Sequence, residues 1–111
     1  MKLGFIGTGK ITESVVTGIS SSKIKYSKIL VSPRNLYIAK KLSKKIKKVS
    51  IGKSNQEIIN SCDWIFLAVT PTVGEKIIKT LKFKSNQTII SFISTITLPR
   101  LKKLINVKAK I

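Results

Sequence analysis

Two glycines, Gly7 and Gly9, follow the first apolar run of the chain, within the stretch GFIGTGKITESVVTGI at residues 4–19. The apolar run before them predicts a strand, and the helical spacing of apolar residues after them predicts a helix. In a strand–turn–helix unit, Gly7 permits a tight turn and Gly9 lets the backbone come close to a phosphate at the positive end of the helix. The pattern therefore favours a dinucleotide-phosphate loop over the alternative that both glycines only form a turn.

Strand and helix signals alternate along the whole chain. Strands are predicted at residues 2–7, 28–32, 63–69 and 88–94, and helices at residues 12–22, 34–46, 54–62, 73–81 and 97–105. Residues 48–52 are either a short extra strand or a connection, and residues 107–111 resemble the start of one more strand. This order predicts an α/β fold, a Rossmann-like doubly wound parallel sheet formed by residues 1–111 as a single domain.

Several of the predicted helices carry end signals or an apolar face. Ser54 and Glu57 have the spacing of a capping box, and Thr97 is expected to cap a helix with proline in its first turn. The lysine-rich helix at residues 34–46 is expected to turn its lysines to solvent and its apolar stripe to the core. The apolar stripe consists of Leu36, Ala39, Leu42 and Ile46.

The 111 residues carry a formal net charge of +18, which by itself would indicate a nucleic-acid or anionic-surface partner. Only Arg34 and Arg100 are arginines, and few aromatic residues accompany the lysines, whereas nucleic-acid sites combine these residue types. We therefore expect no nucleic-acid partner, and a basic nucleic-acid binder on the same scaffold is kept as an alternative. No apolar run approaches the roughly 20 residues of a membrane span, so no membrane partner is expected.

Cys62 is the only cysteine, and the chain contains no histidine. A single cysteine fits a reducing compartment, and the N-terminal residues lack the pattern of a signal peptide, so we expect a cytoplasmic protein. Without a histidine partner, Cys62 is interpreted as a structural thiol at a helix end, and no metal site is predicted. The acidic residues are interpreted as helix-face, cap or strand-edge groups; they are Glu13, Glu57, Asp63 and Glu75.

The end of the second predicted strand discriminates between dinucleotides. An NAD site normally has Asp or Glu there, about 20 residues beyond the glycines, whereas a 2'-phosphate requires neutral and cationic donors. Ser32, Arg34 and Asn35 occupy this segment, and no carboxylate does. A guanidinium offers a forked pair of hydrogen bonds to phosphate, which favours NADP(H) over NAD(H). The alternative is that Arg34 is only a solvated residue of a first helical turn.

Four segments in the same order resemble the N-terminal cofactor domain of the pyrroline-5-carboxylate reductase family. The opening stretch is similar to that family's GFIGxGxMAxAIxxG motif, and residues 32–34 to its S-x-R segment. Residues 54–71 resemble its N-x-E-x-x-x-x-x-D-x-x-x-LAVKP segment, and residues 89–97 resemble its strand that ends in an Ala-Ala-Gly turn. The resemblance runs through nearly the whole chain and implies the same Rossmann-like fold.

The resemblance also implies roles for the matching residues. Residues 6–11 would surround the pyrophosphate, and Ser32 and Arg34 would face the 2'-phosphate. The other matching residues would line the ribose and nicotinamide side. In full, the predicted cofactor-binding residues are Ile6, Gly7, Thr8, Gly9, Lys10, Ile11, Ser32, Arg34, Asn35, Asn55, Ala68, Val69, Thr70, Pro71, Ser94 and Thr95.

The reaction implied by the resemblance is hydride transfer from NADPH to the C=N carbon of 1-pyrroline-5-carboxylate, which gives L-proline. The sequence departs from the family pattern at Thr12, Thr70 and the Ser94–Thr95 pair, and Thr12 is expected to hold the first helix slightly away from the strand. We expect the family's C-terminal helical domain, which forms the homo-oligomer and supplies the imine pocket, to be absent. No catalytic residue is therefore predicted, and the isolated chain is expected to bind NADPH with little turnover.

Two alternatives of other kinds stay open beside this reaction. One is a non-catalytic nucleotide-binding or regulatory module, which the departures at Thr70 and at Ser94–Thr95 would suit. The other is a related NADP-dependent reductase that acts on another imine or keto acid. Both alternatives retain the predicted dinucleotide site and differ in what happens at the nicotinamide.

Overall fold

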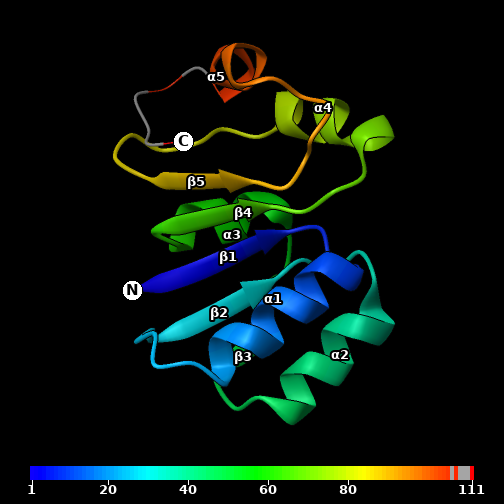
Figure 1. Cartoon of the computed structure of the whole chain (residues 1–111), viewed down its shortest axis with the longest axis vertical. Helices are drawn as coiled ribbons and strands as arrows, with labels where there is room; N and C mark the ends of the chain where they lie inside the picture. Colours follow the sequence, from blue (N-terminus) through cyan, green and yellow to red (C-terminus); the bar gives the residue numbers. More distant parts are fainter. Residues whose placement is uncertain (106, 108–110) are drawn as a thin grey trace.

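The computed structural model describes residues 1–105, 107 and 111, and its centre is a five-stranded parallel sheet. The strands lie in the order β3-β2-β1-β4-β5 (Figure 1). They are β1 (Lys2–Ile6), β2 (Lys28–Val31), β3 (Val49–Ile51), β4 (Trp64–Leu67) and β5 (Thr88–Ser91). The helices that follow them in turn are α1 (Lys10–Ser20), α2 (Leu36–Lys45), α3 (Asn55–Ser61), α4 (Pro71–Thr80) and α5 (Leu98–Ile105). This alternation confirms the predicted Rossmann-like α/β sheet.

Helices cover both faces of the sheet, with α1 and α2 on the opposite side from α3 (Figure 1). On one face, Val16 of α1 and Leu42 of α2 pack with strand residues such as Phe5. On the other face, Ile58 of α3 and Ile78 of α4 belong to a second buried cluster, to which α5 also contributes. The inner strands are therefore buried from both sides, which explains why β4 is a continuous apolar run in the sequence.

The residues that were predicted to cap helices do so in the structure. At α3, the Glu57 N–H donates to Ser54 Oγ at 3.1 Å, and the Lys53 N–H donates to Glu57 Oε1 at 3.3 Å. At α5, the Arg100 N–H donates to Thr97 Oγ1 at 3.4 Å. These contacts confirm Ser54 and Thr97 as helix caps. The Glu57 side chain accepts from the N–H of Lys53, one residue before the cap, and not from the Ser54 N–H that would complete a capping box. The open question about residues 48–52 is also resolved, because β3 pairs with β2 as the outermost strand on that side.

Two details of the sequence-based prediction need correction. Ala39 and Leu42 are buried as expected, and Ile46 is half-buried, but Leu36 is 50% exposed. Leu36 is the first residue of α2, and helical periodicity alone overestimated the burial of this first turn. The ends of two strands also differ: β4 ends at Leu67 and β5 at Ser91, which is two and three residues earlier than predicted from their apolar runs. The further strand predicted at residues 107–111 falls largely outside the described residues.

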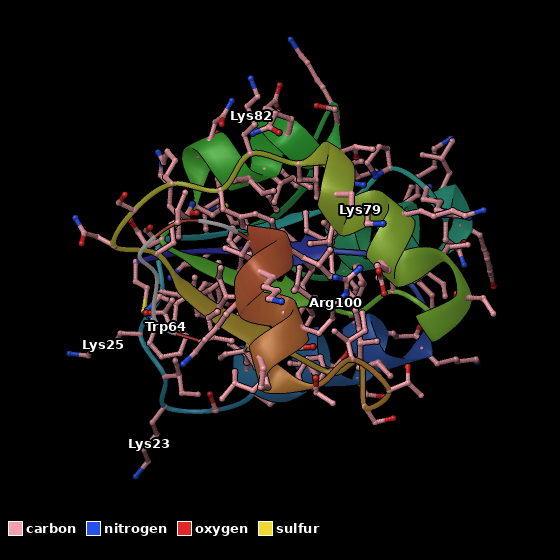
Figure 2. The ribbon with its side chains drawn as sticks, turned by 90° about the horizontal axis from the view of Figure 1, so that it is seen from above. Lys23, Lys25, Trp64, Lys79, Lys82 and Arg100 are labelled. Carbon is pink, nitrogen blue, oxygen red and sulfur yellow. The ribbon has the colours of Figure 1, made fainter. Side chains whose placement is uncertain are left out.

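The lysines form a solvated surface. Every lysine whose burial is described is exposed, and Figure 2 shows Lys23 and Lys25 extending away from the connection between α1 and β2. This exposure agrees with the prediction that the lysine-rich helix turns its charges to solvent. Among the described residues, no helix has the length and apolar character that crossing a bilayer would require.

Candidate functional site

Two adjoining cavities lie at the carboxyl edge of the sheet, where β1, β2 and β4 end. The first has a volume of about 210 Å³ and is lined by Gly7, Thr8, Gly9, Arg34, Asn35, Ala68, Val69, Thr70 and Val73. The second has a volume of about 410 Å³ and is lined by Gly9, Lys10, Ile11, Ala68, Val69, Thr70, Phe92 and Ser94. The two share four lining residues, so they form one continuous groove, in the position where open parallel sheets bind their ligands.

The two glycines of the loop after β1 differ in what a side chain at each position would contact. Gly7 has φ of +97°, and a Cβ placed on it would lie 2.6 Å from the carbonyl oxygen of Ala68. Its turn and the close approach to the loop after β4 both exclude a side chain. Gly9 has extended backbone, and a Cβ placed on it would meet no atom within 4 Å. Gly9 is therefore not required by packing within the chain, and its missing side chain leaves room for a ligand.

The N-terminus of α1 presents backbone donors at this open space. The first helical hydrogen bond is donated by the Glu13 N–H to the Gly9 carbonyl at 3.0 Å, so the amides of residues 10–12 have no intrahelical acceptor. Within the described part of the chain, no side chain caps this helix. Unpaired N–H groups at the positive end of a helix form a site for an anion.

Three hydroxyl groups surround Gly7. Ser32 Oγ accepts a hydrogen bond from the Gly7 N–H at 3.1 Å, and Thr12 Oγ1 donates to the Gly7 carbonyl at 2.6 Å. Thr8 Oγ1 donates to the Ser32 carbonyl at 2.6 Å and lies 2.8 Å from Ser32 Oγ. The exposed fractions of Thr8, Thr12 and Ser32 are 4%, 0% and 1%. Thr12 thus fits at the third motif position with its hydroxyl paired, and Ser32 lies inside the loop and does not line either cavity.

The loop after β2 supplies the polar wall of the first cavity. Arg34 and Asn35 both line it and are both exposed. Asn35 has a second role, because its Oδ1 accepts a hydrogen bond from the Ile38 N–H at 3.3 Å and so caps α2. Arg34 is the only charged side chain among the residues that line this cavity, and no acidic residue lines either cavity in the described chain.

The loops after β4 and β5 form the wall of the second cavity. Ala68, Val69, Thr70 and Ser94 line the groove as predicted, whereas Thr95 is exposed and does not line it. Sequence reasoning missed Val73 and Phe92, which line one cavity each. An apolar residue within a helix or at the end of a strand carries no pattern that separates it from a core residue, so the sequence held no signal for either. Ile6 is fully buried in the core, and the Pro71 side chain lies outside what the structure describes.

Asn55 lies at the start of α3, beyond the end of β3. It does not line either cavity, but its Oδ1 is a buried side-chain oxygen with no hydrogen-bond partner among the described residues. Buried acceptors of this kind are rare in folded proteins, since an unpaired polar atom costs free energy. An oxygen at this edge of the sheet fits a ligand that brings a donor, such as a ribose hydroxyl.

Three of the acidic side chains form ion pairs or hydrogen bonds away from the groove. The carboxylate of Glu13 lies 2.8 Å from Lys41 Nζ, and this hydrogen bond holds the pKa of Glu13 below its usual value. Glu75 pairs with Arg100, which lowers the pKa of Glu75, and Asp63 Oδ2 accepts a hydrogen bond from the Lys2 N–H at 2.9 Å. These positions confirm their interpretation as helix-face and strand-edge groups.

Cys62 ends α3 at the opposite, amino-terminal edge of the sheet from the groove. It is 2% exposed, and burial, with a smaller effect from the charge of Asp63, raises the pKa of its thiol to about 11. A thiol with so high a pKa is protonated at neutral pH and is a poor nucleophile. The burial of Cys62 at the end of α3 agrees with the structural role predicted for it.

Comparison with known proteins places the chain among oxidoreductases. It matches the family described as NADP oxidoreductase, coenzyme F420-dependent, over residues 2–95. It is 32% identical over 108 residues to pyrroline-5-carboxylate reductase 3 of Danio rerio, an alignment that covers 95% of this chain and 37% of that protein.

Solved structures show the same fold. 1-Pyrroline-5-carboxylate reductase from Streptococcus pyogenes is 29% identical with a TM-score of 0.76, over 97% of this chain and 39% of that one. Plasmodium falciparum pyrroline carboxylate reductase with NADP bound is 24% identical with a TM-score of 0.77, over 95% and 38%. Prephenate dehydrogenase from A. aeolicus in complex with hydroxyphenyl propionate and NAD+ is 17% identical with a TM-score of 0.78, over 98% and 40%. At these identities, the last two show the fold alone.

The chain spans less than half the length of each of these relatives. The part that it does span includes the glycine loop and the loops after β2 and β4, which lie within the family match. The chain belongs to the NADP oxidoreductase, coenzyme F420-dependent family, and the resemblance to pyrroline-5-carboxylate reductases that its motifs indicated is confirmed.

Proposed function

We propose that this chain binds NADP(H) in the groove at the carboxyl edge of its sheet, as the cofactor-binding part of a pyrroline-5-carboxylate reductase-like oxidoreductase. The observation that carries the proposal is the loop after β1, where Gly9 faces open space and the first amides of α1 lack intrahelical acceptors. A pyrophosphate accepts hydrogen bonds from such amides and is favoured by the positive end of the helix. The unpaired Asn55 Oδ1 is consistent with a ribose nearby.

The preference for NADP(H) over NAD(H) rests on Arg34. It lines the first cavity beside Asn35, and no carboxylate takes the place that would bind an unmodified ribose. A guanidinium makes charge-assisted hydrogen bonds with a phosphate, whereas an acidic residue would repel it. The family that the chain matches over residues 2–95 is described as an NADP oxidoreductase, which supports the same cofactor class.

The nicotinamide ring supplies the hydride chemistry when the cofactor is bound. Residues of this chain would bind and orient it: the amides at the start of α1 would hold the pyrophosphate, and Thr70, Phe92 and Ser94 would border the nicotinamide end in the second cavity. On the strength of the relatives' names, the proposed substrate is the cyclic imine 1-pyrroline-5-carboxylate. The proposed product is L-proline and the proposed role is cytoplasmic proline biosynthesis, because the motifs resemble that family and a single cysteine fits a reducing compartment. No residue of this chain is proposed as catalytic.

The cofactor proposal is tested by titrating the purified chain with NADPH and with NADH at moderate salt, following nicotinamide fluorescence. We expect micromolar binding of NADPH and clearly weaker binding of NADH. Arg34→Ala should weaken NADPH binding at least tenfold and change NADH binding little, because a charge-assisted hydrogen bond to the 2'-phosphate is lost.

Lys40→Ala is the matched control. Lys40 is an exposed cation of the same helix region that lines neither cavity, so its loss should leave both affinities nearly unchanged. Equal weakening of NADPH and NADH by Arg34→Ala would remove Arg34 from the 2'-phosphate role. Failure of the unaltered chain to bind either dinucleotide would overturn the proposed function.

The reductase proposal requires a separate assay. Mixing the chain with NADPH and 1-pyrroline-5-carboxylate and following the absorbance of NADPH measures turnover directly. Binding of NADPH with little turnover is expected, since none of the described residues is proposed to act on the imine. NADPH binding by the chain together with failure of a longer chain containing it to reduce the imine would favour the non-catalytic module or a different substrate.

A further inference from the structure

Each hydroxyl proton around Gly7 can be assigned to an acceptor. A Thr or Ser hydroxyl has one proton to donate. Thr8 donates its proton to the Ser32 carbonyl, so in the 2.8 Å contact between the Thr8 and Ser32 hydroxyls Ser32 must be the donor. Thr12 donates its proton to the Gly7 carbonyl. All three protons are therefore used inside the loop.

None of the three hydroxyl groups therefore has a proton left to donate to a phosphate. Phosphate oxygens at neutral pH mainly accept hydrogen bonds, so a side chain that binds a phosphate must donate one. Ser32 has no proton to offer without breaking its bond to Thr8, its remaining contact is an accepted bond from the Gly7 N–H, and its side chain is buried with only 1% of the residue exposed. Arg34, in contrast, is exposed and lines the first cavity.

We infer that Thr8, Thr12 and Ser32 form a hydroxyl clamp that holds the glycine loop in shape, and that Ser32 is a positioning residue and not a 2'-phosphate ligand. The clamp holds both polar groups of the Gly7 residue: Ser32 binds its N–H and Thr12 binds its carbonyl oxygen. Gly7 has a positive φ, and a glycine can readily adopt other backbone conformations. The two hydrogen bonds hold it in the conformation that the loop requires. The inference rests on the proposed function, because the loop is held in shape for a dinucleotide.

The clamp separates two roles in this site, the shaping of the glycine loop and the recognition of the 2'-phosphate. It fixes the turn that directs the amides of α1 at the pyrophosphate, a part that NADPH and NADH share. Discrimination of the 2'-phosphate is then left to Arg34 and to its neighbour Asn35, which line the cavity. Preorganisation of this kind raises affinity by reducing the ordering cost of binding.

The decisive experiment compares dissociation constants for NADPH and NADH among variants that are folded by circular dichroism at the temperature of the titration. Ser32→Ala and Thr12→Val should each weaken both cofactors by the same factor, roughly three- to tenfold for the loss of one loop hydrogen bond, so the NADPH-to-NADH ratio is unchanged. Thr12→Ser keeps the hydroxyl and should bind both cofactors nearly as the unaltered chain does. Arg34→Ala, in contrast, should change the ratio.

Two results would overturn the inference. Selective loss of NADPH binding in Ser32→Ala, with NADH unaffected, would make Ser32 a 2'-phosphate ligand. Unchanged affinity for both cofactors in both Ser32→Ala and Thr12→Val would show that the clamp does not position the loop.

A second measurement needs no cofactor. Amide hydrogen exchange followed by NMR should show the Gly7 N–H protected in the unaltered chain and exchanging at least tenfold faster in Ser32→Ala, with the Phe5 amide of β1 as the internal reference. Equal protection of Gly7 in the two proteins would contradict the clamp. Because this readout is independent of binding, failure of the unaltered chain to bind any dinucleotide would refute the proposed function while the clamp is tested separately.

Discussion

The loop after β1 and the loops after β4 and β5 share one edge of the sheet but are held in different ways. Around Gly7, three buried hydroxyls are all hydrogen-bonded, two of them directly to Gly7. After β4 and β5, Thr70, Phe92 and Ser94 are exposed. Among the described residues, the hydroxyl of Thr70 lies 3.3 Å from that of Thr72 and has no closer hydrogen-bond partner.

This difference separates a preformed region from an open one. The first loop owes its shape to bonds within the chain, so its conformation does not depend on a ligand. In the described part of the later loops, the Ile93 N–H donates to Ser91 Oγ, but the groove-lining hydroxyl of Thr70 contacts only that of Thr72. What occupies the groove therefore contributes more to the final arrangement of these loops. Substitutions should therefore cost more stability in the first loop than in the later ones.

Gly7→Ala is the strongest test of this comparison. The new Cβ would face a strained φ of +97° and lie 2.6 Å from the Ala68 carbonyl oxygen. We expect the free energy of unfolding to fall by about 2–4 kcal/mol, as measured by urea denaturation.

Gly9→Ala is its control, since a Cβ there meets no atom within 4 Å and the backbone is extended. Its stability should stay within about 0.5 kcal/mol of the unaltered chain, while NADPH binding weakens at least tenfold because the methyl group occupies the space of the ligand. Similar stabilities for the two variants would break the distinction between a packed and an open glycine.

Cys62 is buried at the opposite edge of the sheet, away from the groove. Burial raises the pKa of the Cys62 thiol to about 11 from its ordinary value of 9.0. The unfolded chain loses this proton first as the pH rises, so the contribution of the thiol to stability is complete below pH 9 and is lost between about pH 9 and pH 11. The loss should reach about 2 kcal/mol at pH 11.

Urea unfolding of the chain and of Cys62→Ala over this range measures the loss, and the difference between the two removes the titration of the lysines. The stability of the unaltered chain should fall more steeply with pH than that of Cys62→Ala. Parallel curves would show that the thiol is not held in a buried environment.

The smallest expected effects belong to the open loops. Phe92 is 37% exposed and stacks on Phe66 with ring centroids 6.2 Å apart. Phe92→Ala should lower the free energy of unfolding by about 1 kcal/mol, since only part of the ring is buried, and Thr95→Ala should change it by less than about 0.5 kcal/mol. A loss from Phe92→Ala as large as that from Gly7→Ala would mean that the later loops are as firmly packed as the first.

The fold was predictable because its determinants are local. Glycine spacing, helix caps such as Ser54 and the apolar run of β4 each constrain the backbone directly, and together they gave the order of strands and helices. The burial of Leu36 was predicted wrongly because periodicity identifies the apolar face of a helix but not which of its turns the rest of the chain covers.

The candidate site was predictable in part. The positions of Gly7, Gly9 and Arg34 follow from the motif and from the end of β2, and the structure brings all three to one cavity. Phe92 and the hydroxyl clamp were not predictable, because each depends on contacts between residues far apart in the sequence, such as the 25 positions between Gly7 and Ser32. A serine that pairs with the loop and one that faces a phosphate look the same in a sequence.

The most direct test of the account is an NMR titration of the isotope-labelled chain with NADPH, in which the backbone amide resonances are followed one by one. The amides of Gly9, Lys10 and Ile11 are expected to shift most and to saturate together, because the proposed pyrophosphate site is at the start of α1. Saturable binding that leaves these amides unmoved and shifts instead the lysine-rich face of α2, or no shifts at all, would contradict it.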